Sequence, residues 1–164
     1  MQRHEVSFIV DAPPERVWKL FHAPPPAGST TPRRVEYPGG WVEILFEGDE
    51  DGKGLVRQCG FGVPKYLLSK GVARSWEVVI EARKNEYARY RAVGKPLWSN
   101  AEGWHELKAL DSGRTQLTFV ETYDVINPFM RLLLEKRVHR YISRHNSALY
   151  LKILGYLGTV TQVT

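Results

Sequence analysis

Residues 115–157 read TQLTFVETYDVINPFMRLLLEKRVHRYISRHNSALYLKILGYL and carry the two patterns that decide the fold. Residues 115–125 alternate in the manner of a strand with one buried face. Its expected inward residues are Leu117, Phe119, Glu121 and Tyr123. From Asn127-Pro128 onward, apolar residues recur at three- and four-residue spacing, which predicts one helix running to about Leu157. The stretch therefore predicts a strand followed directly by a long C-terminal helix.

The region before this stretch reads as strands joined by short turns. We expect strands at 41–48, 54–62, 73–81, 86–93, 105–110 and 115–125, with turns such as DEDGKG and DSGR between them. Connections this short cannot hold a parallel crossover, so neighbouring strands must be antiparallel.

The N-terminal region adds one more strand and a short helix. Residues 4–10 alternate, with Val6, Phe8 and Val10 on one side. A short helix is expected over 13–21, and the Pro-rich segment 22–34 is expected to be a loop. The whole chain then predicts an α+β fold: a seven-stranded, curved antiparallel sheet that wraps around the long C-terminal helix.

Composition places the chain among ordinary globular domains. It has 164 residues, 43% hydrophobic and 25% charged, so we expect a single domain over 1–164. The lone cysteine, Cys59, excludes an internal disulfide, and no zinc spacing or cofactor motif is visible, so no metal or cofactor is expected. No apolar run is long enough to span a membrane, and the first residues lack the apolar core of a signal peptide. A cytoplasmic location is the simplest expectation.

Four segments, together with the element order, carry a family resemblance. They are VSFIVDAPPERVWKLF (6–21), GLVRQCGF (54–61), ARYRAVGKPL (88–97) and SGRTQLTFVETY (112–123). With them the chain resembles the START/birch-pollen-allergen-like (SRPBCC) superfamily, and within it the polyketide cyclase/dehydratase-like group. The resemblance implies a helix-grip fold that holds an apolar ligand, such as a lipid, fatty acid or polyketide-like molecule, between sheet and helix. After Phe21 the sequence departs from the common pattern of the superfamily. The resemblance therefore does not predict the loop at the entrance of such a cavity, or any activity tied to that loop.

Alternation along the strands predicts which side chains face that cavity. The expected ligand-binding residues come from the short helix, the inner sheet face and the long helix. They are Phe21, Arg57, Cys59, Phe61, Trp76, Tyr90, His105, Leu107, Phe119, Glu121, Tyr123, Leu134, Val138 and Tyr141. Cys59 reads as a small buried hydrophobic residue. Arg57 either finds a partner inside or extends to the rim, and the rim is favoured because an unpaired buried charge is costly.

A second function class, an enzyme, depends on His105 and Glu121. In one register of the expected hairpin, the residue numbers of each pair of facing residues add up to 226. This register sets His105 and Glu121 opposite each other. A carboxylate beside an imidazole would make a general base for enolisation or cyclisation, with Tyr90 or Tyr123 donating to the enolate oxygen. The alternative interpretation is an ordinary polar pair.

A third class is an interaction module. The net charge is +5, and residues 131–152 contain six cations and only Glu135 as an acid. This stretch is either a solvated helix face or a surface for an anionic membrane or an acidic partner. Nucleic-acid binding is not expected, because the remaining basic residues are spread among acidic ones. The oligomeric state stays open, because an edge strand can pair with a second copy.

Overall fold

The computed structural model describes residues 1–22, 33–37, 40–67, 69–110 and 113–163. Its helices and strands follow one another as β1 (Gln2–Val10), α1 (Pro14–His22), β2 (Arg33–Tyr37), β3 (Gly40–Phe46), β4 (Val56–Gly62), η1 (Lys65–Leu67), β5 (Val72–Arg83), β6 (Tyr87–Lys95), β7 (Ser99–Ala109), β8 (Thr115–Val125), α2 (Pro128–Leu154) and β9 (Val160–Gln162). The predicted order of strand, short helix, meander and long helix is confirmed.

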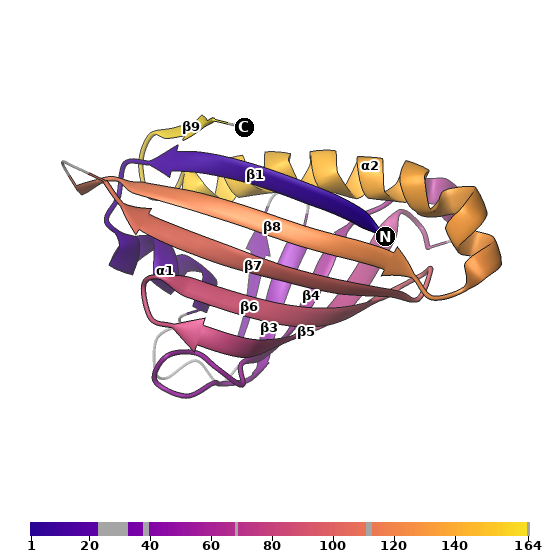
Figure 1. The fold of residues 1–164 in the computed structure, drawn as a ribbon, viewed down its shortest axis with the longest axis horizontal. Coiled ribbons are helices and arrows are strands. Elements are labelled where there is room, and N and C mark those ends of the chain that lie inside the picture. The colour runs from indigo at the N-terminus through magenta and orange to yellow at the C-terminus, as the bar shows by residue number, and fades with distance from the viewer. Residues whose placement is uncertain (23–32, 38–39, 68, 111–112, 164) are drawn as a thin grey trace.

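The nine strands of the described residues form one antiparallel sheet, in the order β2-β3-β4-β5-β6-β7-β8-β1-β9. Figure 1 shows the sheet bending so strongly that β3 and β4 cross the direction of β7 and β8, while α2 lies along the side that the sheet leaves open. The fold is a helix grip.

The sequence-based count of seven strands was wrong by the two edge strands. β2 has five residues, including charged ones, and β9 has three, so neither produces a clear period-2 apolar signal. Within the predicted loop 22–34, His22 belongs to α1, Arg33 and Arg34 belong to β2, and 23–32 lie outside the described residues.

Two polar side chains, Asn127 and Glu135, set where α2 begins and how it joins the sheet. The Asn127 side chain caps its first turn by accepting hydrogen bonds from the N–H groups of Phe129 and Met130 at 3.0 and 3.1 Å. About two turns further on, the Glu135 carboxylate accepts hydrogen bonds from the Val125 N–H at 3.0 Å and the Gln2 side-chain amide at 3.1 Å. Glu135 is 4% exposed and thereby ties α2 to the ends of β8 and β1.

The core lies between the inner sheet face and α2. Phe8 and Leu117 are fully buried, and Phe119 and Leu154 pack into the same apolar cluster. A second cluster, around Val125 and Val138, fills the end of the molecule where α2 begins. In the described part of the chain, no helix is both long and apolar enough to cross a membrane.

Candidate functional site: a cavity between the sheet and α2

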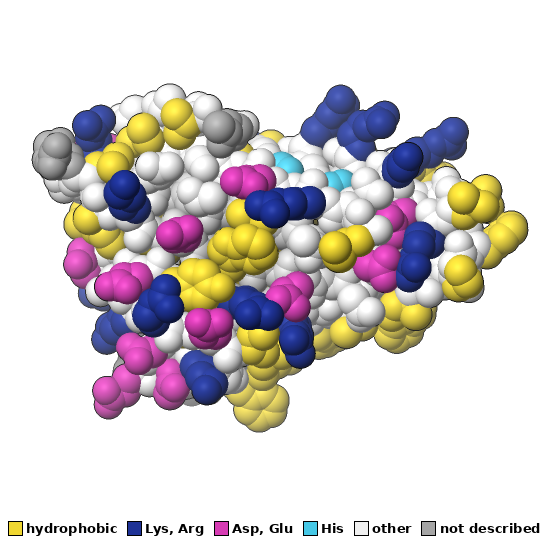
Figure 2. Space-filling view, viewed as in Figure 1, with side chains coloured by type: hydrophobic (Ala, Val, Ile, Leu, Met, Phe, Trp, Pro, Cys, Tyr) yellow, Lys and Arg dark blue, Asp and Glu magenta, His cyan; other side chains and the backbone are white. Residues whose placement is uncertain are grey.

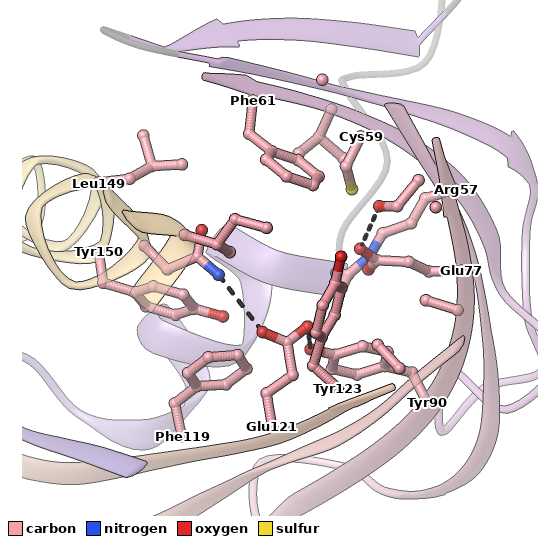
Figure 3. A pocket seen from close by; sticks show the side chains of 18 of the residues that line it. Arg57, Cys59, Phe61, Glu77, Tyr90, Phe119, Glu121, Tyr123, Leu149 and Tyr150 are labelled. Atoms are coloured by element: carbon pink, nitrogen blue, oxygen red, sulfur yellow. Dashed lines mark hydrogen bonds and ion pairs between the residues drawn. The ribbon is translucent and has the colours of Figure 1, made fainter. Parts of the chain in front are cut away.

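A cavity of about 140 Å³ lies between the inner sheet face and α2. Its walls are mostly apolar and aromatic, with charged groups on the sheet side and the polar groups of Asn146 and Tyr150 on α2 (Figure 3). Eight residues expected to bind ligand line it: Phe21, Arg57, Cys59, Phe61, Tyr90, Phe119, Glu121 and Tyr123. The alternation of β4, β6 and β8 thus predicted one wall of the cavity.

Glu121 projects from β8 into the cavity, where two side chains hold it (Figure 3). The Tyr90 hydroxyl donates to Glu121 Oε1 at 3.2 Å, and the Asn146 amide of α2 lies 3.4 Å from Oε2. Burial raises the pKa of the Glu121 carboxyl to about 7, and the nearby Glu77 charge adds to the effect. The protonated and the ionised forms of this carboxyl are therefore both populated near neutral pH.

Gly103 makes the contact between Tyr90 and Glu121 feasible. Tyr90 pairs with Gly103 across β6 and β7, and Gly103 pairs with Glu121 across β7 and β8. A Cβ placed at Gly103 would lie 2.5 Å from the Tyr90 hydroxyl oxygen. The missing side chain leaves the space through which Tyr90 reaches across the middle strand.

Arg57 does not extend to the rim, as the sequence analysis favoured, but lies inside as half of a buried ion pair. Its Nε is 2.7 Å from Glu77 Oε2, and the two side chains are 9% and 12% exposed. β4 and β5 set the two residues directly opposite each other, and the Ser75 hydroxyl donates to the second Glu77 oxygen at 2.9 Å. Burial lowers the pKa of Arg57, but the Glu77 carboxylate and other nearby groups together outweigh burial and raise the pKa, so the guanidinium keeps its charge.

The predicted inward face of β5 was wrong. Trp76, expected in the cavity, lies on the outer face with Val78, whereas Ser75, Glu77 and Val79 point inward. Apolar residues stand on both faces of this strand, so its alternation carried no clear phase. In the observed orientation of β5, Glu77 points inward and pairs with Arg57.

The predicted pair of His105 and Glu121 does not form. His105 stands opposite Phe119, and Glu121 stands opposite Gly103, so paired residues sum to 224 rather than 226. The hairpin closes with the Leu110 N–H donating to the Arg114 carbonyl, and this turn sets the register.

His105 is instead buried behind the cavity wall, at 1% exposure. Its Nε2 shares a 2.5 Å hydrogen bond with the hydroxyl of Tyr150, a cavity residue on α2. Burial, together with the charge of Arg57, lowers the pKa of His105 well below its usual value, so the imidazole is neutral. Within the described residues its Nδ1 has no hydrogen-bond partner. His22, which carried no functional expectation, stacks on Trp18 and meets the His105 ring edge-on.

Several other expected ligand-binding residues lie elsewhere. Leu107 belongs to the core, and Leu134 packs in the cluster where α2 begins. Val138 lines a separate small cavity of about 20 Å³, and Tyr141 stacks on His145 outside the main cavity. Leu134 and Val138 thus lie on the inner side of α2 but beyond the main cavity, whereas Tyr141 lies off the inner face, which continues through Ile142.

The sequence analysis also missed residues that complete the cavity. On α2 they are His139, Ile142, Asn146, Leu149, Tyr150 and Ile153, and on the sheet they include Trp41, Ser75 and Glu77. The α2 residues do recur at helical spacing and include no Lys, Arg, Asp or Glu, which is the signal that could have found them. No group of three or more His, Cys, Asp or Glu among the described residues is arranged to hold a metal ion.

Over residues 1–150 the sequence matches the family described as "Polyketide cyclase / dehydrase and lipid transport". The chain belongs to this family. Membership supports a ligand-binding or cyclase role and the binding of a hydrophobic small molecule. None of the curated proteins compared with the chain matches it.

Solved structures agree with this fold. A conserved protein from Geobacillus kaustophilus is similar with a TM-score of 0.65 at 14% identity, covering 99% of this chain and 100% of that one. A START superfamily protein from Mycobacterium smegmatis gives 0.60 at 15%, covering 94% and 97%. The Zhui aromatase/cyclase from Streptomyces sp. R1128 gives 0.56 at 20%, covering 95% and 93%. Identities this low show a shared fold and do not transfer an activity.

Proposed function

We propose that this protein binds a compact apolar molecule that carries a hydroxyl or carbonyl oxygen, with that oxygen directed to Glu121. The observation that carries the proposal is the cavity itself, whose apolar walls surround a polar centre made by Tyr90, Glu121 and Asn146. The other charged groups in its wall, Arg57 and Glu77, are already paired with each other. A small-molecule site combines these two features, because apolar walls supply affinity and a few placed polar groups fix orientation.

The volume of the cavity limits the ligand. An engineered apolar cavity of roughly 150 Å³ binds benzene, and the cavity here is about 140 Å³. A ring-sized ligand fits without rearrangement, whereas a long fatty acid or a multi-ring polyketide would require the cavity to widen.

The polar centre favours a neutral ligand oxygen. Tyr90 and Asn146 are donors, and Glu121 accepts when ionised and donates when protonated. Arg57 is already paired with Glu77, so a ligand carboxylate would have to compete with that ion pair.

The direct test is native mass spectrometry of freshly purified protein, followed by extraction and identification of any bound compound. The protein would then be heated with substituted phenols, small aryl ketones and fatty acids in turn. We expect a co-purifying ring compound or a raised Tm with the phenols or ketones. An empty protein that none of these compounds stabilises would refute the proposal.

A second candidate function is proton transfer to or from the bound molecule. The specific observation that favours it is a carboxyl inside the cavity whose pKa is raised to about 7, close to the operating pH. As a base, ionised Glu121 would remove a proton from the carbon beside a ligand carbonyl, and a tyrosine hydroxyl would donate to the enolate oxygen. The candidate of the sequence analysis that paired His105 with Glu121 gives way to Glu121 with Tyr90, with His105 acting only through Tyr150.

This candidate is tested with the one-ring ketone phenylacetone in deuterated water, following exchange of the acidic protons beside its carbonyl by NMR. Glu121→Gln should abolish the catalysed exchange while the ketone still raises the Tm. Catalysed exchange that persists in Glu121→Gln would rule out the carboxylate as base.

A further inference from the structure

The first turns of α2 expose large apolar side chains to solvent. Phe129, Leu132 and Leu133 are 65%, 82% and 52% exposed. In Figure 2 hydrophobic side chains project at the end of the molecule where α2 begins in Figure 1. A protruding group of this kind marks a contact surface, because a soluble domain gains nothing from leaving these side chains in water.

Four cations continue the same face of the helix. Lys136, Arg137, Arg140 and Arg144 are all exposed. They follow Leu133 at three- and four-residue spacing, so they share one side of α2 with it. Figure 2 shows basic side chains projecting along the edge of the molecule that α2 forms. The opposite side of the helix packs inward through residues such as Ile142.

These cations lack acidic neighbours. Ion pairs recorded in the described part of the chain involve Arg131 but none of the four, and the nearby acid Glu135 is buried beneath the helix. Like charges three or four residues apart on a helix repel and destabilise it slightly. These four side chains therefore carry positive charge that no acidic side chain neutralises within the described residues, and an external anion can compensate it.

We propose that this face, made of Phe129, Leu132 and Leu133 followed by Lys136, Arg137, Arg140 and Arg144, docks on an anionic membrane surface. The apolar first turns enter the headgroup region, and the cations contact the lipid phosphates. An anionic membrane binds both parts of this face, because its headgroup region accommodates apolar side chains and its lipid phosphates attract cations. A nucleic acid would bind the cations alone. The proposal does not depend on the ligand of the cavity, although docking would place the helical wall of the cavity against the bilayer.

The test is sedimentation of the full chain with vesicles of phosphatidylcholine containing about one third phosphatidylglycerol, at low and high salt. We expect the protein to sediment with these vesicles at low salt, to be released at high salt, and to ignore vesicles of phosphatidylcholine alone. Equal binding to neutral vesicles, or none to anionic ones, would overturn the proposal.

Two charge variants distinguish the effect of this helix face from the effect of the protein's net charge. Each Lys or Arg near an anionic surface is worth about fivefold in partitioning, so R137E/R140E should lose on the order of 25-fold or more. The control, K53E/K108E, changes the same charge at two exposed sites on the β3–β4 loop and on β7. An equal loss in the control would overturn the assignment to α2.

A third variant tests the apolar half. L132S/L133S should reduce partitioning about tenfold while leaving the Tm unchanged, because neither side chain is buried in the folded protein. Partitioning to the anionic vesicles that L132S/L133S leaves unchanged would overturn the proposal that the apolar first turns enter the headgroup region.

Discussion

At the scale of single residues, Glu121 couples the cavity to pH. Its folded pKa of about 7, raised by burial and by Glu77, lies above the ordinary value of 4.5. The folded state therefore binds the proton more tightly than the unfolded state, and this group destabilises the fold as pH rises from about 4.5 to about 7. Above that window the full cost of holding an ionised, buried carboxylate is present.

Glu121→Gln should remove this cost. The amide keeps the acceptor that Tyr90 uses but carries no charge. We expect the variant to match wild type near pH 5 and to exceed its unfolding free energy by roughly 1–3 kcal/mol at pH 8. Urea unfolding at both pH values measures the difference, and parallel stability profiles for the two proteins would contradict it.

Gly103 supplies a second test at this scale, because its lack of a side chain is what admits Tyr90. Gly103→Ala should cost about 1–3 kcal/mol, since the new methyl group meets the tyrosine ring. The matched control is the same change in a Tyr90→Ala background, where the clash is gone. Equal costs in the two backgrounds, measured by urea unfolding, would show that Tyr90 is not the residue displaced.

At the scale of elements, the junction between α2 and the sheet depends on a buried acid. Burial raises the pKa of Glu135, but hydrogen bonds from the Val125 N–H and Gln2, together with the N-terminal ammonium, outweigh this and leave the pKa lowered. A lowered pKa means that the ionised carboxylate stabilises the fold above its unfolded pKa and that this stability is lost as pH falls through the folded value.

Glu135→Ala removes the acceptor and leaves the Val125 N–H without its partner. We expect a loss of about 2–3 kcal/mol at pH 7 that shrinks toward pH 3, because the carboxyl of wild type is then protonated too. Asn127→Ala is the control: it removes a cap of the same helix worth about 1 kcal/mol without any pH dependence below neutrality. A Glu135→Ala loss that is the same at both pH values would contradict an ionised contact.

At the scale of the whole molecule, the cavity is a space that a larger side chain can occupy. Ala92 lines it from β6, and Ala92→Leu adds three carbon atoms toward the interior. We expect this variant to keep or raise the Tm while losing ligand binding, because the space is filled before the ligand arrives.

The measurement is the Tm shift produced by a ligand that stabilises wild type. A ligand at about 100 times its Kd stabilises the folded state by about 2.7 kcal/mol, and in Ala92→Leu this gain should largely vanish. Ala109→Leu serves as control, since it adds the same atoms at an exposed site on β7. An unchanged ligand effect in Ala92→Leu would place the binding site elsewhere.

Local patterns were sufficient to predict the helix from Asn127, the antiparallel meander and the inward phase of β4, β6 and β8. Apolar periods, caps and short turns are properties of neighbouring residues, so the amino-acid sequence alone determines them. The family resemblance of the opening segment rests on the same local information.

Only the tertiary structure decided which residues meet. The β7–β8 turn put His105 opposite Phe119 instead of Glu121, and the pairing of Arg57 with Glu77 accompanies a β5 phase that its own residues left ambiguous. The rotation of α2, which brings Asn146 to Glu121, depends on packing against strands more than twenty residues away along the chain. These relations join distant segments, and their free energies exist only once the sheet and helix have packed together.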